Sequence, residues 1–412
     1  MNVTITPTRL EGTITPPPSK SQAHRVLIAA ALADGVSRID NVAFSQDIEA
    51  TMRCLEQLGA AFERDGNTVT VRGLGANAMS PLRRLAPPRL DCGESGSTLR
   101  FLIPIALAVR GGGIFSGRGR LMERPQKPYF DLFDEKGVFY EQTNGVLTVQ
   151  GLLPPGEYRL PGDVSSQFVT GLLYALPLPD GDSELVLTSP LESAGYAAMT
   201  LQALERFGVA VGHRNFRRFQ IPGGQVYRPA DAVIEADWSQ AGFWYAANGL
   251  GSAVKVLGMD PESAQGDRVI AAHLETLSRP GDVDIDVSGC PDLAPPLAAM
   301  AAVRSGTTRL TNAARLRIKE SDRLAAVTQV LSALGADAAE GPDSLTIRGK
   351  DCLAGGIKVD SFNDHRIAMM AAVAATRCGK PVTVTGAECV AKSYPTFWDD
   401  YEMLGGKIKK SG

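Results

Sequence analysis

The segment PPPSKSQAHR, at residues 16–25, places a cation between two hydroxyl groups where an apolar helix is about to begin. Proline is tolerated at the first helical turn, and Ser19 or Ser21 can cap the helix. The remaining amides and the helix dipole favour an anion at this end, beside Lys20 and Arg25. The glycines of the GxxxxGK[ST] phosphate loop are absent. The segment predicts an anion site of another kind, with a plain capped helix as the alternative.

The segment RIKESDRL, at residues 317–324, carries a second charged cluster. Lys319 and Arg323 are four residues apart, which would place them on one face of a helix, with Glu320 beside them. The alternative is an exposed helix start with ordinary i,i+4 ion pairs.

The segment SFNDHRIAM, at residues 361–369, carries a third cluster, in which Asn363 or Asp364 would cap a very apolar helix. His365 and Arg366 then fall in its first turn. A cation there is unfavourable by about 0.3–1 kcal/mol unless an anion accompanies it. Arg366 is therefore predicted to serve an anionic ligand.

Four further segments place polar groups at helix starts or next to proline. A Gly/Ser-rich turn in ESGSTLRFL can present backbone amides to an oxyanion. The other three carry polar side chains at Arg124 in ERPQKP, at Ser165, Ser166 and Gln167 in GDVSSQF, and at Lys392 in AKSYP. A cap is a serious alternative for the GDVSSQF serines.

A repeat predicts the elements that must position these groups. An apolar helix ends at a glycine, and a strand, a turn and a second strand end at another glycine 14 or 15 residues later. The four clear copies run between Gly59 and Gly73, Gly137 and Gly151, Gly208 and Gly223, and Gly335 and Gly349. Glycine suits a helix end because it adopts the left-handed conformation without steric strain.

Two weaker copies extend the repeat to six units of about 69 residues. The fifth is expected to turn near Gly281, and the sixth stops after Gly405 and one short strand. We expect the N-terminal strand NVTITPTRLEGTIT to complete the sixth unit. Both termini would then lie in one domain, with chain crossings in TPPPSK (15–20) and VYRPADAVIE (226–235).

Composition limits the classes of function. The 412-residue chain is 44% hydrophobic and 21% charged, with a net charge of −3, so neither a nucleic-acid partner nor a membrane surface is expected. Six scattered cysteines without a CxxC pair indicate reduced thiols in a cytoplasmic protein, and four histidines without a metal-binding spacing predict no metal site. No stretch is apolar enough for a membrane span or a signal peptide.

Seven motifs taken together resemble the 5-enolpyruvylshikimate-3-phosphate (EPSP) synthase family across essentially the whole chain. They are PPPSKSQAHR, ESGSTLRFL, MERPQKP, GDVSSQF, PDLAPPLAAMAA, RIKESDRL and NDHRIAM. The resemblance implies an α/β fold, a two-domain inside-out α/β barrel with three βαβαββ units in each domain. Domain I would comprise residues 1–18 plus 229–412, domain II residues 19–228, and the active site would lie in the interdomain cleft.

The resemblance implies transfer of the enolpyruvyl group of phosphoenolpyruvate to the 5-hydroxyl of shikimate 3-phosphate, through a non-covalent tetrahedral intermediate and with release of phosphate. The two substrates carry roughly six negative charges, which a dense set of cations must offset. No cofactor and no macromolecular partner are implied, and we expect a monomer. Gly96 leaves room beside phosphoenolpyruvate, so glyphosate inhibition is also expected, although Glu94 stands where many members carry Asn.

Family correspondence assigns roles residue by residue. Asp292 matches the base for the attacking hydroxyl, Glu320 matches the acid, and Lys20 shares proton transfer. Shikimate 3-phosphate would be bound by Lys20, Ser21, Arg25, Ser165, Ser166, Gln167, Ser193, Tyr196, Asp292 and Lys319. Phosphoenolpyruvate would be bound by Lys20, Gly96, Arg124, Gln167, Glu320, Arg323, His365, Arg366 and Lys392. Arg315 replaces an Asn of some members, so that contact is not carried over.

Two alternative functions remain. A UDP-N-acetylglucosamine enolpyruvyl transferase would share the fold, but it usually carries a reactive cysteine in the loop before the Arg124 position, and VRGGGIFSGRGRLMERP has none. A non-catalytic phospho-sugar binding protein would be favoured by loss of Lys20, Asp292 or Glu320, and all three are present.

Overall fold

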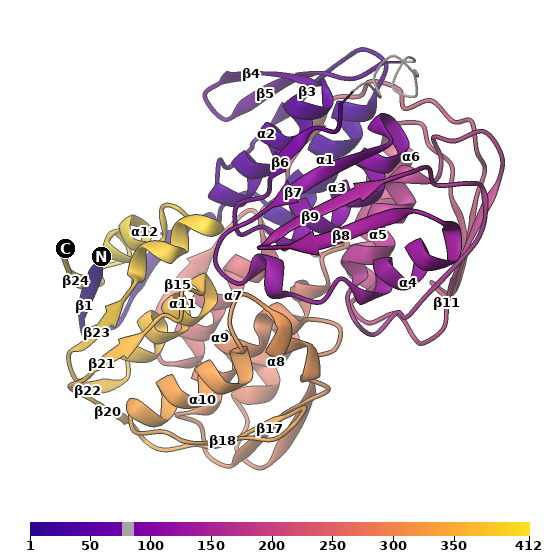
Figure 1. Ribbon diagram of the computed structural model, residues 1–412. Helices are drawn as coiled ribbons and strands as arrows, with labels where there is room; N and C mark the ends of the chain where they lie inside the picture. The colour runs from indigo at the N-terminus through magenta and orange to yellow at the C-terminus, as the bar shows by residue number, and fades with distance from the viewer. Residues whose placement is uncertain (76–85) are drawn as a thin grey trace. The chain divides into compact units, whose positions relative to one another are not determined.

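The computed structural model describes residues 1–75 and 86–412, and this part of the chain divides into two compact units (Figure 1). Unit 1 comprises Met1–Pro17 and Ala236–Gly412, and unit 2 comprises Pro18–Glu235. The sequence analysis placed the changes of domain at 18/19 and 228/229, whereas the chain changes unit after Pro17 and after Glu235. No helix among the described residues is long and apolar enough to cross a bilayer.

Unit 2 contains three βαβαββ repeats, each with one four-stranded sheet. In every sheet the first two strands are parallel, and the closing hairpin pairs antiparallel with the second strand. The second repeat is β6 (Arg89–Asp91), α3 (Gly96–Arg110), β7 (Gly112–Ser116), α4 (Lys127–Lys136), β8 (Phe139–Thr143) and β9 (Val146–Gln150). The third is β10 (Gly156–Leu160), α5 (Ser166–Ala175), β11 (Ser183–Leu187), α6 (Ala194–Arg206), β12 (Gly212–Arg214) and β13 (Arg218–Ile221).

The first repeat of unit 2 borrows a strand from the end of the unit. It contains α1 (Lys20–Leu32), β3 (Val36–Asp40), α2 (Gln46–Leu58), β4 (Ala61–Asp65) and β5 (Thr68–Arg72). The missing edge strand is β14 (Ala232–Val233), which pairs parallel with β3 just before the chain leaves the unit. The sheet order β14-β3-β5-β4 therefore matches that of the other two repeats.

Unit 1 repeats the pattern twice. One copy is β16 (Val283–Asp286), α9 (Ala294–Ala301), β17 (Thr307–Thr311), α10 (Arg323–Ala333), β18 (Asp337–Glu340) and β19 (Leu345–Arg348). The other is β21 (Lys358–Asp360), α11 (His365–Ala375), β23 (Val382–Thr385), α12 (Phe397–Met403), β24 (Lys407–Ser411) and β1 (Asn2–Thr6). Here β1 lies between β23 and β24, beside both termini in Figure 1. The prediction that the N-terminal strand completes the sixth repeat is confirmed for Asn2–Thr6, whereas Glu11–Ile14 of the same segment forms a separate strand in another sheet.

The remaining repeat of unit 1 is incomplete: the hairpin expected to follow the turn near Gly281 is absent from the described residues. The repeat consists of β2 (Glu11–Ile14), α7 (Trp238–Gly249), β15 (Ala253–Val256) and α8 (Ile270–Leu277), with β2 parallel to β15. The strand after Gly281 is β16, which pairs parallel with β17 and opens the next repeat. Only β16 lies between Gly281 and the 3-10 helix η4 (Pro291–Leu293), so no second strand is available for that hairpin. A further two-stranded sheet joins β20 (Leu353–Gly355) and β22 (Cys378–Lys380).

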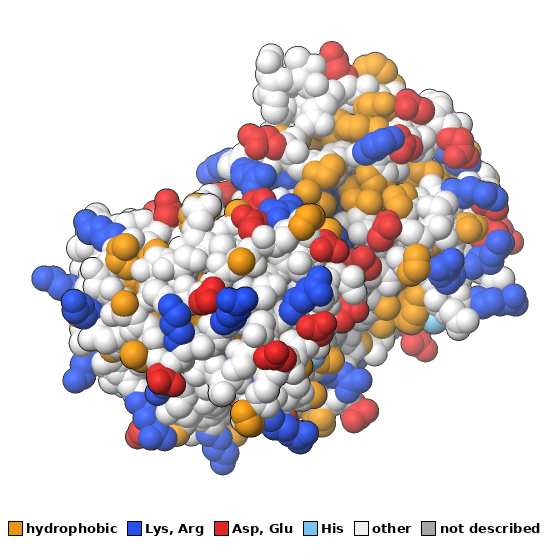
Figure 2. Space-filling view, turned by 90° about the horizontal axis from the view of Figure 1, so that it is seen from below, with side chains coloured by type: hydrophobic (Ala, Val, Ile, Leu, Met, Phe, Trp, Pro, Cys, Tyr) orange, Lys and Arg blue, Asp and Glu red, His pale blue; other side chains and the backbone are white. Residues whose placement is uncertain are grey.

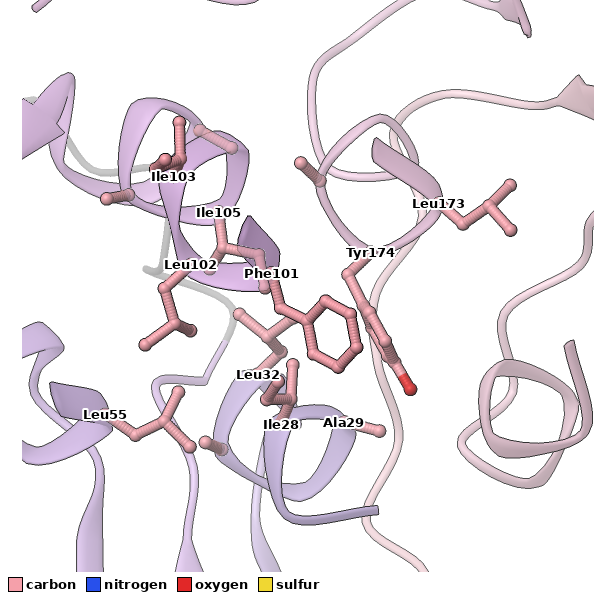
Figure 3. Close-up of a cluster of buried hydrophobic side chains, with 14 of the residues drawn as sticks. Ile28, Ala29, Leu32, Leu55, Phe101, Leu102, Ile103, Ile105, Leu173 and Tyr174 are labelled. Carbon is pink, nitrogen blue, oxygen red and sulfur yellow. The ribbon is translucent and has the colours of Figure 1, made fainter. Parts of the chain in front are cut away.

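The helices lie inside each unit and the sheets outside, which is the inside-out arrangement that the family resemblance implies. All residues of α9 and α11 are buried, as is almost the whole of α3, whereas β5 and β9 alternate buried and accessible residues. Figure 3 shows Ile28 of α1, Leu55 of α2, Phe101 of α3 and Tyr174 of α5 meeting in the core of unit 2. The sheets are open, and the described strands close no barrel.

The paired glycines of the repeat serve two different needs. The first ends a helix in the left-handed conformation, with φ of 110° at Gly59 and 68° at Gly137. The second permits close backbone packing, since a Cβ at Gly73 would collide with the carbonyl oxygen of Ala33. A Cβ at Gly349 would collide in the same way with the carbonyl oxygen of Arg304.

Candidate functional site

The first helix of unit 2 carries the first predicted cation. Ser19 caps α1, its hydroxyl accepting from the amide of Gln22 at 3.3 Å. Lys20 is the first helical residue, and its Nζ lies 2.8 Å from Oδ2 of Asp47, near the start of α2. Both side chains are largely shielded from solvent. Asp47 therefore holds the ammonium in place, and the sequence analysis did not find it.

Arg25 is buried one turn further along α1 and joins three helices. Its Nε donates to the carbonyl of Tyr196 at 3.1 Å and to Oγ1 of Thr200 at 2.9 Å, both in α6. Its Nη2 lies 3.4 Å from Oγ1 of Thr170 in α5, and its Nη1 donates to the carbonyl of Ser21 at 2.7 Å. Burial lowers the pKa of Arg25 to about 10, still well above neutrality. Three predicted residues, Ser21, Arg25 and Tyr196, thus lie together.

The N-terminus of α3 forms a second polar site in unit 2. Ser95 caps the helix, and a Cβ added to Gly96 would lie 2.7 Å from Nη1 of Arg124 and 3.5 Å from Oε1 of Gln167. Gln167 is fixed from both ends, accepting from Arg100 at 2.9 Å and donating to Ser97 at 3.0 Å. The structure therefore brings Gly96, Arg124 and Gln167 together.

The predicted serines occupy the starts of two helices of unit 2. Ser165 caps α5 by accepting from the amide of Gln167 at 3.3 Å, and Ser166 is the first residue of that helix. Ser193 precedes α6 with φ of 56°, a left-handed conformation that is uncommon for serine. Backbone strain of this kind concentrates at functional sites, which agrees with the predicted role of Ser193.

Asp292 is the centre of the predicted cluster in unit 1. Its carboxylate accepts from Nη1 of Arg323 and from Nη2 of Arg366, each at 2.9 Å, and Nζ of Lys319 lies at 3.6 Å. Burial alone would raise the pKa of Asp292, but attraction to Arg366, Lys319 and Arg323 lowers it well below its ordinary value. The carboxylate is therefore ionised at neutral pH.

Arg323 is buried among three carboxylates. Besides Asp292, it contacts Glu320 at 2.6 Å and Asp364 at 2.8 Å. Burial opposes its charge, but attraction to Asp364, Glu320 and Asp292 raises the pKa of Arg323 above its ordinary value. Asp364 also caps α11 by accepting from the amide of Arg366 at 3.0 Å, so it links two predicted cations.

The expectation that Lys319 and Arg323 share a helix face is wrong. Asp322 caps α10, its side chain accepting from the amide of Ala325 at 3.2 Å, so the helix begins only at Arg323. Lys319 follows a short 3-10 helix, η5 (Ala314–Ile318). Lys319 and Arg323 both approach Asp292 because of the path of the loop between η5 and α10, and not because they share a helix. Burial lowers the pKa of Lys319, and attraction to Asp292 opposes that change.

The first turn of α11 and the end of η6 (Ala387–Lys392) complete the cluster of unit 1. Nη2 of Arg366 donates to Oγ of Ser239, at the start of α7, at 2.9 Å. Nζ of Lys392 donates to the carbonyl of Asn363 at 2.5 Å, and His365 lies buried next to Asp364. Five predicted residues, Asp292, Lys319, Glu320, Arg323 and Arg366, thus form one connected network, with His365 and Lys392 at its edge.

Lys20 and the charged groups around Asp292 form ion pairs within their clusters. Within the described ranges, no group of three or more His, Cys, Asp or Glu side chains is arranged to hold a metal ion. On the face drawn in Figure 2, Lys and Arg side chains are interspersed with Asp and Glu side chains and form no single basic patch. The clusters can bind multiply charged anions and offer carboxylates for proton transfer.

Two of the residues that hold the predicted cations had no signal of their own in the sequence. Asp47 is near the start of an ordinary amphipathic helix, and Ser239 is in the first turn of another. Asp364 was anticipated only as a helix cap, and its contact with Arg323 was not. These partners come from elements distant in sequence, so only the fold reveals them.

Comparison with known proteins identifies close relatives along the whole chain. A sequence profile described as EPSP synthase (3-phosphoshikimate 1-carboxyvinyltransferase) matches residues 5–401. The chain is 47% identical to a 3-phosphoshikimate 1-carboxyvinyltransferase of Clostridium kluyveri, with 98% of each sequence covered. It is 44% identical to one of Clostridium novyi, covering 99% of this chain and 98% of the relative.

Solved structures show the same similarity. An EPSP synthase from Acinetobacter baumannii matches with a TM-score of 0.79 and 25% identity, covering 99% of this chain and 100% of that one. The enolpyruvyl transferase NikO from Streptomyces tendae matches with a TM-score of 0.77 and 18% identity, covering 99% of this chain and 98% of that one. At that identity the second match shows the fold alone.

Proposed function

The chain belongs to the EPSP synthase (3-phosphoshikimate 1-carboxyvinyltransferase) family, and we propose that its two clusters of charged residues bind the two substrates of that family. The reaction of the family transfers the enolpyruvyl group of phosphoenolpyruvate to the 5-hydroxyl of shikimate 3-phosphate and releases phosphate, in the shikimate pathway. The chain is an enzyme of this class.

The observation that carries the proposal is the network around Asp292. Three cations converge on one largely shielded carboxylate, with Glu320 held 2.6 Å from the same Arg323 that contacts Asp292. This arrangement supplies a base, a carboxyl acid and positive charge within one connected set of side chains. Both proton-transfer groups therefore sit where phosphate and carboxylate groups would bind.

We assign the cluster of unit 2 chiefly to shikimate 3-phosphate. Arg25 keeps its charge although it is buried, and the serines at the starts of α5 and α6 add neutral donors. The residues assigned to this substrate are Lys20, Ser21, Arg25, Ser165, Ser166, Gln167, Ser193 and Tyr196, with Asp292 and Lys319 from unit 1. Arg124, Gly96 and Gln167 form the part of unit 2 assigned to phosphoenolpyruvate, because the Arg124 guanidinium and the Gln167 amide oxygen lie beside Gly96. The remaining phosphoenolpyruvate ligands are Lys20, Glu320, Arg323, His365, Arg366 and Lys392.

Asp292 is assigned as the base that takes the proton of the attacking hydroxyl. In the protein without substrates, burial raises the pKa of Asp292, but attraction to Arg366, Lys319 and Arg323 outweighs burial and holds the pKa low. Substrate phosphate and carboxylate groups would share these cations, so their negative charge would raise the pKa of Asp292 and make it a stronger base. Substrate binding would thereby prepare the base for the proton transfer.

Glu320 is assigned as the acid that protonates the methylene carbon, with Lys20 sharing proton transfer. The intermediate is a tetrahedral ketal that is not bonded to the enzyme, so no nucleophile is needed. We further propose that the protein works as a monomer and that it lies in the cytoplasm; its six free cysteines support the second point.

Phosphate release from phosphoenolpyruvate tests the proposal directly. We expect turnover with shikimate 3-phosphate and none with UDP-N-acetylglucosamine, and the reverse would overturn the assignment. The second acceptor is not favoured, since the curated relatives are 3-phosphoshikimate 1-carboxyvinyltransferases. A glyphosate titration in the same assay shows whether Gly96 leaves enough room for that inhibitor beside Glu94.

A further inference from the structure

A chain of buried hydroxyl groups connects helices α1, α2 and α3 of unit 2. Nδ1 of His24 lies 2.8 Å from Oγ1 of Thr51, which lies 2.6 Å from Oγ1 of Thr98. Oγ1 of Thr98 in turn donates to Oγ of Ser95 at 2.7 Å. All four side chains are fully buried. This row of hydrogen bonds therefore ends at Ser95, the residue that caps α3 directly before Gly96.

The hydrogen bonds along these four side chains can be donated in only one direction. A hydroxyl has one hydrogen to donate. Thr98 uses its hydrogen on Ser95, so it must accept from Thr51. Thr51 has then used its own hydrogen and must accept from His24. The imidazole is therefore protonated at Nδ1.

The surroundings of the imidazole agree with this tautomer. Nε2 of His24 is buried and has no hydrogen-bond partner among the described residues, as suits a nitrogen without a hydrogen. The ring packs edge-on against Phe101, with centroids 6.4 Å apart. Burial, and then the charges of Lys20 and Arg25, lower the pKa of His24 well below its ordinary value, so the ring is neutral.

We propose that His24 is a positioning residue for phosphoenolpyruvate: its Nδ1–H starts a relay through Thr51 and Thr98 that fixes the cap of α3. Ser95 accepts both the hydroxyl hydrogen and the amide hydrogen of Thr98, the latter at 3.1 Å. The cap in turn sets the first-turn amides at Gly96 and Ser97, which lack partners within the helix and lie at the positive end of its dipole, where an anion is favoured. His24 acts only through this relay.

The inference rests on the proposed function, because it assigns the start of α3 to phosphoenolpyruvate. Its first test does not depend on activity. Nitrogen-15 NMR of the imidazoles of the full chain, assigned with a His24→Asn sample, should show His24 neutral and protonated at Nδ1. A ring protonated at Nε2, or at both nitrogens at pH 7, would overturn the proposed direction of the relay.

The second test separates positioning from general stability. His24→Leu removes the donor, and we expect KM for phosphoenolpyruvate to rise about twofold to tenfold, the effect of one neutral hydrogen bond. KM for shikimate 3-phosphate and kcat should change less than twofold. His24→Asn should restore KM, because its amide can donate from a position close to that of Nδ1. An unchanged KM for phosphoenolpyruvate, or an equal rise for both substrates, would refute the role.

A double-mutant cycle shows whether the effect passes through the relay. In a Thr98→Val background, His24→Leu should cause no further rise in KM, whereas additive effects would contradict the relay. Thr51→Val provides the same test if His24→Leu does not fold, since valine keeps the shape of the side chain. Thr276→Val, at an exposed hydroxyl of α8, is the matched control. If the wild-type chain shows no turnover at all, the proposed function fails, while the NMR result still decides the relay.

Discussion

Replacement of Asp292 by Asn tests the electrostatics of the unit 1 cluster most directly. The carboxylate accepts from two guanidinium groups at 2.9 Å and lies 3.6 Å from an ammonium group. Breaking a buried ion pair from one side costs about 3–5 kcal/mol, because the remaining charge is left without compensation. Asp292 is 17% exposed and Asn keeps one acceptor, so we expect a loss of about 3 kcal/mol in the free energy of unfolding.

The assay is urea unfolding at pH 7 with and without inorganic phosphate. In Asp292→Asn the cations attract phosphate more strongly, so phosphate should stabilise the variant more than the wild type. Asp284→Asn is the matched control, since Asp284 is exposed on β16 and forms no ion pair among the described residues. Turnover should fall about 10²- to 10⁴-fold through loss of the base.

The pH dependence of the free energy of unfolding tests the same electrostatics. Because the folded state lowers the pKa of Asp292, its stabilisation is present above the unfolded value of about 3.9 and is lost as pH falls through the folded value. Asp292→Asn should therefore lose less stability than the wild type over that acidic range. Equal stability of the two proteins at pH 7, with equal stabilisation by phosphate, would refute the reasoning.

Three further predictions concern other parts of the chain. Gly96→Ala should raise KM for phosphoenolpyruvate about tenfold, measured by phosphate release, because the new Cβ must displace Nη1 of Arg124 from 2.7 Å. Below about pH 6.5 the unfolded chain protonates His24 while the folded chain does not, so the wild type should lose up to about 1.4 kcal/mol per pH unit relative to His24→Asn in urea unfolding. Ile5→Ala should lower the free energy of unfolding by about 2–5 kcal/mol, because Ile5 is fully buried on the strand between β23 and β24; a loss below 1 kcal/mol would contradict that placement.

The repeat could be predicted from the sequence because glycine spacing reports local backbone needs. Gly59 and Gly137 end helices in the left-handed conformation, and Gly73 and Gly349 sit where a Cβ would meet a carbonyl. The same reasoning failed near Gly281, where a turn precedes a strand that belongs to the following repeat. A turn signal fixes the bend of the chain but not the partner of the strand that follows it.

The candidate site was predictable in its residues but not in its contacts. Residues such as Arg366 were found because a cation at a helix N-terminus requires an anion. The helix predicted over RIKESDRL was misplaced. Asp322 caps the helix, so it begins only at Arg323, and the i,i+4 spacing of Lys319 and Arg323 was a weaker signal than this cap. The contact of Asp364 with Arg323 joins two different repeats, and no local pattern encodes such a pairing.

The carboxylates within both clusters explain how the folded protein tolerates closely spaced cations when no substrate is bound. Asp47 compensates Lys20, and Asp292 compensates Arg323 and Arg366, so unoccupied cations do not repel one another at full strength. At the proposed site, each substrate anion would compete with an internal carboxylate for the same donors. The binding free energy would then be the difference between two similar interactions. That exchange would leave Asp292 less tightly paired when the substrates are bound, which is the state in which the proposed base is needed.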